Sequence, residues 1–190
     1  MIKLLILPGS ARRDSYNRKL AGIAAKIATD AGAEVDLVDP ADFRLPLYDA
    51  ELEEAEGLPA KAKALKKKFL AAQAIIFVSP EYNSSITPLM KNIIDWVSRT
   101  ESDEEPDLVA YKGKVAGLLS ASPGGFGGMR GLVHLRSILG NIGVLVVPNQ
   151  FALSKAYEKF DEGGQLKDPK ELESVRGVVT KVIAVASKLA

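Results

Sequence analysis

The sequence predicts an α/β fold, a three-layer sandwich in which a five-stranded parallel sheet carries helices on both faces. Five short apolar runs have the near-continuous hydrophobicity of strands that are buried on both sides. Segments with apolar residues at helical spacing alternate with these runs, and such alternation favours parallel strands with right-handed connections. A length of 190 residues and a hydrophobic content of 47% suit one well-packed domain spanning residues 1–190.

The first unit starts at the beginning of the chain. Residues 2–7 form a nearly unbroken apolar run and are the first expected strand. Residues 16–30 are rich in Ala, Leu and Ile at helical spacing, and Gly32 suits a helix C-cap. Residues 34–38 are a short second strand. Residues 41–56 have mixed charge and no clear period, so we expect a surface loop there.

The second unit surrounds the third strand. Residues 58–70 are expected to form a helix, opened by Pro59 near its first turn. Residues 74–79 are the third strand, because the run is apolar almost throughout. Residues 87–99 are the next helix, with Pro88 at its start.

The remaining third of the chain repeats the alternation. Residues 114–120 are the fourth strand, and residues 129–139 are a helix. Residues 143–147 are the fifth strand, after which residues 152–167 look irregular. Residues 169–189 form the closing helix.

The loop after the first strand decides between two arrangements of five strands. A flavodoxin-like sheet has the order 2-1-3-4-5 and binds a mononucleotide where strands 1 and 3 meet. Half of a dinucleotide-binding fold requires three glycines after strand 1. Here that loop reads Gly9-Ser10-Ala11-Arg12-Arg13-Asp14 and has one glycine. We therefore predict the flavodoxin-like order.

The composition excludes several classes of function. A formal net charge of +1 creates no field that recruits nucleic acid, and no apolar run is long enough for membrane insertion. The chain has no cysteine, which excludes thiolate metal sites and a cysteine nucleophile and fits a cytoplasmic protein. His134 is the only histidine, so we expect no metal site.

The first loop has the donors that a phosphate needs. Ser10, Ser15 and Asn17 offer side-chain donors and Arg12 offers a charged fork, all near the start of a helix. The alternative is that Ser15 or Asn17 merely caps the helix. Four donors within eight residues favour the phosphate.

Two further loops follow strands 3 and 4 at the same edge of the sheet. In the first of them, Pro80 turns the chain, and the next residues present backbone and polar groups that suit a flat heterocycle. The alternative is a polar turn in which Tyr82 packs on a neighbour. The loop of residues 122–128 contains four glycines, which allow a ligand to approach the backbone closely, and Ser122 is its best candidate for a contact.

These motifs resemble those of the NADPH-dependent FMN reductase family, the flavodoxin-like quinone, chromate and azo reductases. The resemblance depends on GSxRxxSxN at residues 9–17 and on PEYN at residues 80–83, running into KNxxDW within residues 89–96. Residues 127–130 and 134–136 add to it.

The resemblance implies that FMN is the cofactor. It implies that the first loop holds the FMN phosphate and that the other two loops frame the isoalloxazine ring. The implied cofactor-binding residues are Ser10, Arg12, Ser15, Tyr16, Asn17, Pro80, Glu81, Tyr82, Asn83, Ser84, Ser122 and Gly124.

The resemblance also implies the activity. Hydride passes from NADPH or NADH to N5 of FMN, and the electrons then reach a small-molecule acceptor such as a quinone, azo compound, metal oxyanion or free flavin. No protein side chain acts as catalytic nucleophile or base. A homodimer or homotetramer is implied, in contact through the helix that carries Trp96.

The alternative is a flavodoxin-like electron-transfer module that does not oxidise nicotinamide. Such proteins often carry a strongly acidic face, and their phosphate loops are rich in Ser and Thr and contain no arginine. The net charge of +1 and the presence of Arg12 favour the enzyme.

Overall fold

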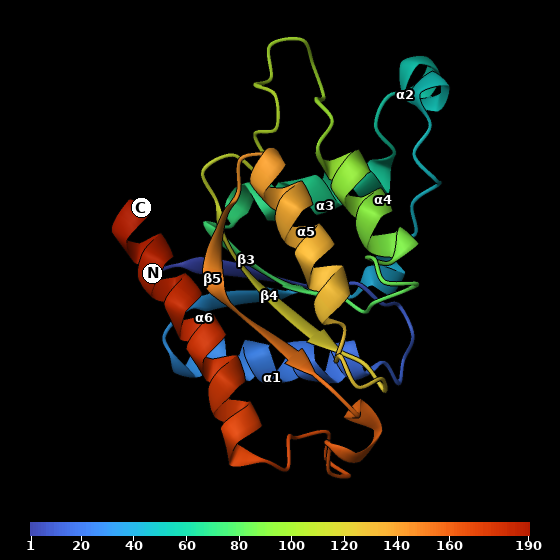
Figure 1. Cartoon of the computed structure of the whole chain (residues 1–190). Coiled ribbons are helices and arrows are strands. Elements are labelled where there is room, and N and C mark those ends of the chain that lie inside the picture. Colours follow the sequence, from blue (N-terminus) through green and yellow to red (C-terminus); the bar gives the residue numbers. More distant parts are fainter.

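The computed structural model describes residues 1–190 and has three layers (Figure 1). Five parallel strands form one sheet in the order β2-β1-β3-β4-β5, which confirms the predicted flavodoxin-like order. The strands are β1 (Lys3–Pro8), β2 (Glu34–Leu37), β3 (Ala74–Val78), β4 (Val115–Ala121) and β5 (Leu145–Leu153).

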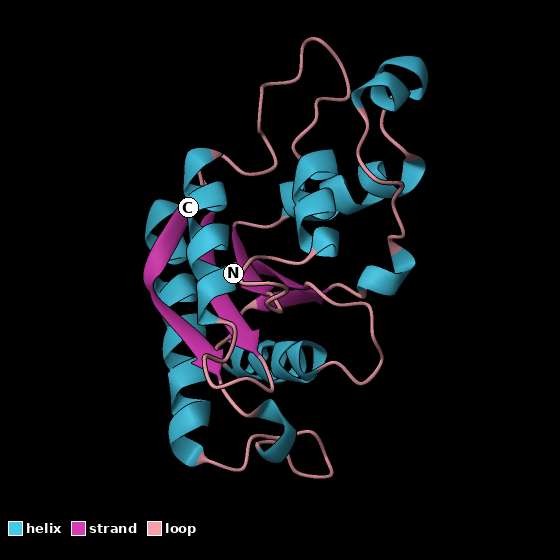
Figure 2. Ribbon diagram, turned by 45° about the vertical axis from the view of Figure 1, so that its right-hand side comes forward, coloured by secondary structure: helices cyan, strands magenta, loops and turns pink.

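Helices cover both faces of the sheet (Figure 2). One layer contains α1 and α6, and the other contains α3, α4 and α5. None of the helices combines the length and the hydropathy that a bilayer-spanning segment requires. The helices are α1 (Tyr16–Asp30), α2 (Ala50–Glu56), α3 (Ala60–Ala71), α4 (Pro88–Val97), α5 (Met129–Asn141) and α6 (Pro169–Leu189), with short 3₁₀ turns η1 (Pro40–Asp42) and η2 (Ala156–Glu158).

Alternate residues of each central strand enter two separate cores. In β1, Leu4 and Ile6 belong to a cluster of 26 buried residues under α1 and α6. Leu5 and Leu7 belong to a cluster of 21 buried residues under α3, α4 and α5. Because both faces are covered, both sets of positions must be apolar, and the strand reads as a continuous hydrophobic run.

The predicted loop over residues 41–56 is wrong in its second half, where the chain forms α2. Asp49 starts this helix, because its side chain accepts hydrogen bonds from the backbone N–H groups of Glu51 and Leu52. The helix buries none of its residues, so it has no apolar period that would reveal it in the sequence.

The fifth strand is longer than predicted and continues beyond Pro148 to Leu153. Its register against β4 shifts, with Val146 opposite Ala116 and Gln150 opposite Leu118. The strand lies at the edge of the sheet, where a proline and an irregularity are tolerated. A proline inside the run therefore marks a bulge here and does not end the strand.

Trp96 lies inside the molecule. Its side chain is fully buried, and its Nε1–H donates to the carbonyl of Pro46 at 2.8 Å. The ring of Tyr48 meets it edge-on at a centroid distance of 5.1 Å. The segment before α2 thus covers Trp96, which is a core residue of this chain.

Candidate functional site

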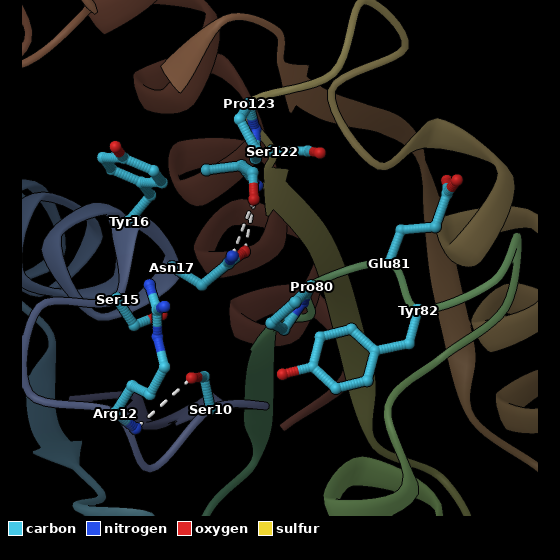
Figure 3. Close-up of a pocket in the computed structure, with 11 residues that line it drawn as sticks. Ser10, Arg12, Ser15, Tyr16, Asn17, Pro80, Glu81, Tyr82, Ser122 and Pro123 are labelled. Atoms are coloured by element: carbon cyan, nitrogen blue, oxygen red, sulfur yellow. Dashed lines mark hydrogen bonds between the residues drawn. The ribbon is translucent and has the colours of Figure 1, made fainter. Parts of the chain in front are cut away.

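Three loops surround a cavity of about 430 Å³ at the carboxyl edge of the sheet (Figure 3). They follow β1, β3 and β4, which are neighbours in the sheet, and β1 and β3 form the point where the strand order reverses. The cavity is lined by Ser10, Arg12, Ser15, Tyr16, Asn17, Pro80, Glu81, Tyr82, Ala121, Ser122 and Pro123.

The amino end of α1 opens into the cavity without a capping side chain. Ser15 occupies the N-cap position with φ −70° and ψ 128°, but its hydroxyl makes no capping hydrogen bond. The first-turn N–H groups of an α-helix have no partners within the helix. They carry the positive end of the helix dipole and favour an anion. The structure therefore contradicts the alternative in which the Ser15 hydroxyl caps α1.

Charge in this half of the cavity is positive. Arg12 is exposed and takes part in no salt bridge. Ser10 and Ser15 are buried, and the Ser10 hydroxyl oxygen accepts a 3.4 Å hydrogen bond from the Arg12 backbone N–H. Glu81 is the only acidic residue among the lining side chains. An anion entering beside α1 therefore meets donors and a free cation.

Asn17 lines the cavity but is already engaged with β4. Its Nδ2 donates to the carbonyl of Ala121 at 2.7 Å, and the N–H of Ala121 donates to its Oδ1 at 2.9 Å. The carboxamide thus replaces a missing pair of sheet hydrogen bonds at the end of β4. One N–H of Nδ2 is left for a ligand.

The loop after β3 is a tight hairpin. The N–H of Tyr82 donates to the carbonyl of Ser85 at 2.9 Å, and the reverse bond is 3.0 Å long. Asn83 and Ser84 form its tip with φ values of 49° and 66°, in the left-handed region. Neither tip residue lines the cavity. The hairpin presents the Tyr82 ring, which is 53% exposed, beside Pro80 (Figure 3).

The side chain of Glu81 turns away from the cavity centre (Figure 3). Its carboxylate accepts from Arg130 Nε at 2.9 Å and from the backbone N–H of Gly131 at 3.1 Å. Burial raises the pKa of Glu81, but these hydrogen bonds and the charge of Arg130 outweigh burial and lower the pKa overall. Glu81 is therefore an ionised group already matched with a cation.

The glycine-rich loop is held by the chain that leaves β5. The N–H of Ser122 donates to the carbonyl of Leu153 at 3.0 Å, and the N–H of Lys155 donates to the carbonyl of Gly124 at 3.3 Å. The N–H of Gly124 also donates to the Ser122 hydroxyl oxygen at 3.2 Å. Gly124 therefore shapes the loop from outside the cavity.

The structure brings together all the predicted site residues except Asn83, Ser84 and Gly124. Ala121 and Pro123 line the cavity without having been predicted. They flank Ser122 and contribute through backbone position. No side-chain chemistry marks such residues in a sequence, although their place beside Ser122 at the end of a strand was a signal.

The sequence and the fold match known proteins over nearly the whole chain. The sequence profile described as NADPH-dependent FMN reductase matches residues 2–158. A protein named NAD(P)H:quinone oxidoreductase from Solanum tuberosum is 36% identical, over 100% of this chain and 95% of the relative. A quinone reductase from Escherichia coli is 34% identical, over 94% of this chain and 92% of the relative.

A solved structure has the same fold. The flavoenzyme NAD(P)H:(acceptor) oxidoreductase FerB from Paracoccus denitrificans superposes with a TM-score of 0.84 and is 27% identical in sequence. The match covers 99% of this chain and 98% of that chain. The three-layer arrangement is thus shared along the entire length.

Proposed function

The chain belongs to the NADPH-dependent FMN reductase family, and from that membership we propose that it binds FMN at the carboxyl edge of the sheet. It is an NAD(P)H-dependent oxidoreductase that reduces a quinone-type acceptor. The single observation that carries the proposed site is one cavity that joins the opening of α1 to the Tyr82 hairpin.

The donor set fits FMN. A terminal phosphate needs several donors and a cation, and the uncapped end of α1 with Ser10, Ser15 and Arg12 supplies them. The only carboxylate that lines the cavity, that of Glu81, is bound to Arg130. The cavity volume of about 430 Å³ also lies in the ordinary range for small cofactors, roughly 300–1,000 Å³.

The residues around the opening of α1 have separate proposed roles. Ser10, Arg12 and Ser15 bind the phosphate, and Asn17 orients the opening of α1 while offering its remaining N–H. Tyr16 closes this side and is itself fixed by stacking on Phe160, at a centroid distance of 5.9 Å.

The other two loops bind the ring. Pro80, Tyr82 and Ser122 contact it directly, whereas Asn83, Ser84 and Gly124 act through the backbone shape of their loops. FMN, when bound, supplies hydride and electron transfer, so no side chain has to act as a nucleophile.

Exposed apolar side chains lie in the glycine-rich loop and at the start of α5, the segments that follow the cavity-lining residues Ser122 and Pro123. Phe126 and Met129 are 62% and 46% exposed, and the Arg130 guanidinium lies 5.0 Å from the centre of the Phe126 ring. We propose that NAD(P)H and a quinone occupy this rim in turn, since both present a flat ring. Azo compounds, metal oxyanions and free flavins are further candidate acceptors.

Assembly and location are also part of the proposal. We infer a homodimer or homotetramer, in which a second copy covers part of the exposed apolar rim. We infer a cytoplasmic protein, since reduced nicotinamide is a metabolite of that compartment and the chain carries no cysteine.

Anaerobic reduction tests the proposed function. Protein loaded with FMN is mixed with NADPH or NADH, and the visible absorption of the flavin is followed. We expect bleaching within seconds and recovery of the colour when a benzoquinone is added. Absorption that persists contradicts nicotinamide oxidation and favours an electron-transfer module. Failure of the protein to bind FMN contradicts the site itself.

A further inference from the structure

Helix α5 lacks a capping side chain of its own. Its N-cap is Gly128, which has a φ of 92° and no side chain to accept from the first-turn N–H groups. A larger residue does not fit there, because a Cβ on Gly128 would collide with the hydroxyl of the buried Ser120. The carbonyl of Phe126 accepts from the N–H of Met129 at 3.0 Å, so an acceptor for the rest of the first turn has to come from another segment.

Glu81 provides that acceptor from the loop after β3. Its Oε2 accepts from the N–H of Gly131, in the first turn of α5, at 3.1 Å. Its Oε1 accepts from the guanidinium of Arg130 at 2.9 Å. The Glu81 side chain is only 8% exposed, whereas the side chain of Arg130 is 53% exposed. A carboxylate at a helix amino end is stabilised by the helix dipole as well as by these bonds.

A second contact ties the same two segments together. The Nδ1 atom of His134, one turn further along α5, lies 2.9 Å from the hydroxyl of Ser85. Gly131 allows the close approach, since a Cβ there would lie 3.0 Å from the carbonyl oxygen of Ser85. Helix α5 thus touches the chain on both sides of the Tyr82 hairpin.

We propose that Glu81 is a positioning residue, which caps α5 from the neighbouring loop and thereby fixes the Tyr82 hairpin relative to the glycine-rich loop. Glu81 lies between Pro80 and Tyr82, so its backbone lines the cavity while its carboxylate faces α5 (Figure 3). The inference rests on the proposed FMN site. It assigns the carboxylate to the geometry of that site and not to contact with the cofactor.

The test compares Glu81→Ala with Asp168→Ala. Asp168 caps α6 by accepting from the N–H of Lys170 at 2.8 Å, and it does not line the cavity. Both variants lose a helix cap, but only one cap adjoins the proposed site. We expect FMN binding, measured by quenching of flavin fluorescence, to weaken about fivefold to tenfold in Glu81→Ala and to stay unchanged in Asp168→Ala.

Two further variants keep the test decisive if Glu81→Ala folds poorly. Glu81→Gln keeps an acceptor for Gly131, and Arg130→Gln removes the cation while leaving that bond. We expect both to lie between wild type and Glu81→Ala in FMN affinity and in the visible circular dichroism of the bound flavin. This signal reports the asymmetry around the ring, which mere loss of stability does not change.

The outcomes separate the inference from the proposed function. If wild type binds FMN and Glu81→Ala binds it equally well with the same circular dichroism, the positioning role is wrong. Equal weakening in Asp168→Ala also overturns it, because the effect would then be general destabilisation. Wild-type protein that does not bind FMN instead contradicts the proposed function.

Discussion

Arg12 is the only cation that lines the cavity, and the side chains around it leave its charge free. A guanidinium that meets a phosphate forms charge-assisted hydrogen bonds, each of which contributes about 1.5–3 kcal/mol. We expect Arg12→Ala to weaken FMN binding roughly tenfold to a hundredfold, as measured by equilibrium titration. The neighbouring Arg13 is exposed and does not line the cavity, so Arg13→Ala is the matched control. Equal affinities in the two variants would show that Arg12 does not hold the phosphate.

Residues close together in the sequence were the ones whose roles could be predicted. Ser10, Arg12 and Ser15 are neighbours in one loop, and their hydroxyl and guanidinium donors together indicate a single anionic ligand. The direction of the Glu81 side chain could not be predicted in this way, because its partner Arg130 lies 49 positions away in the sequence. A single sequence contains no signal for such a pairing. Gly128 at the start of α5 indicates only that the helix has no capping side chain of its own.

At the scale of elements, side chains join the loops of the site to the strands and helices around them. Asn17 is buried, with 3% of its surface exposed, and links the start of α1 to the end of β4. Thr87 links the start of α4 to the first loop, since its hydroxyl donates to the carbonyl of Gly9 at 2.9 Å. These bonds set the distance between the loops before any ligand arrives.

Replacing Asn17 by leucine tests how much this link stabilises the fold. The substitution leaves the N–H and the carbonyl of Ala121 buried without partners, which costs about 1–3 kcal/mol for each group. We expect the free energy of unfolding to fall by about 2–6 kcal/mol, measured by denaturant titration of the protein without FMN. Asn141→Leu, at an exposed position at the end of α5, is the control and should change stability little. A loss in Asn17→Leu no larger than that of the control would mean that the link contributes nothing.

Elements with a two-sided apolar pattern were predictable, and those without one were not. The strands β1, β3 and β4 are buried on both faces, so their apolar runs identified them. Helix α2 buries no residue, and it touches the body of the molecule through Leu52, which packs near Trp96, and Glu53, which forms a salt bridge with Arg99. The outer part of β5 is only partly buried and contains Pro148, so its sequence does not alternate cleanly.

At the scale of the whole molecule, both helical layers pack on apolar clusters, and ion pairs add to this packing. The carboxylates matched with cations in the layer of α3, α4 and α5 include Glu81 with Arg130, and Glu105 with Lys66, whose side chain is 1% exposed. Lys66 also donates to the carbonyl of Arg99 at 2.7 Å, so it joins α3 to the end of α4 and to the loop before β4.

These ion pairs predict where acid destabilises the protein. Burial raises the pKa of Glu105, but hydrogen bonds from Lys66 and from the N–H of Glu101 outweigh burial, and the pKa falls below its ordinary value of 4.5. A carboxylate with a lowered pKa in the folded state stabilises it above the unfolded pKa. That contribution disappears as the pH falls through the folded-state pKa. The pKa of Glu81 is also lowered, so both ion pairs lose their stabilising contribution as the pH falls into the acidic range.

Glu105→Gln isolates one pair, because glutamine resembles the protonated carboxyl group in shape and charge. We expect the variant to be less stable than wild type near pH 7, since it leaves the buried Lys66 with only the more distant carboxylate of Glu101, at 3.9 Å. As the pH falls below about 4.5 and then through the lowered folded-state pKa of Glu105, the wild-type carboxyl becomes neutral, so the two free energies of unfolding should converge. Glu54→Gln, at an exposed position on α2, should follow wild type at every pH. A gap between Glu105→Gln and wild type that stays constant from neutral to acidic pH would mean that the Lys66 pair does not control the acid stability of this layer.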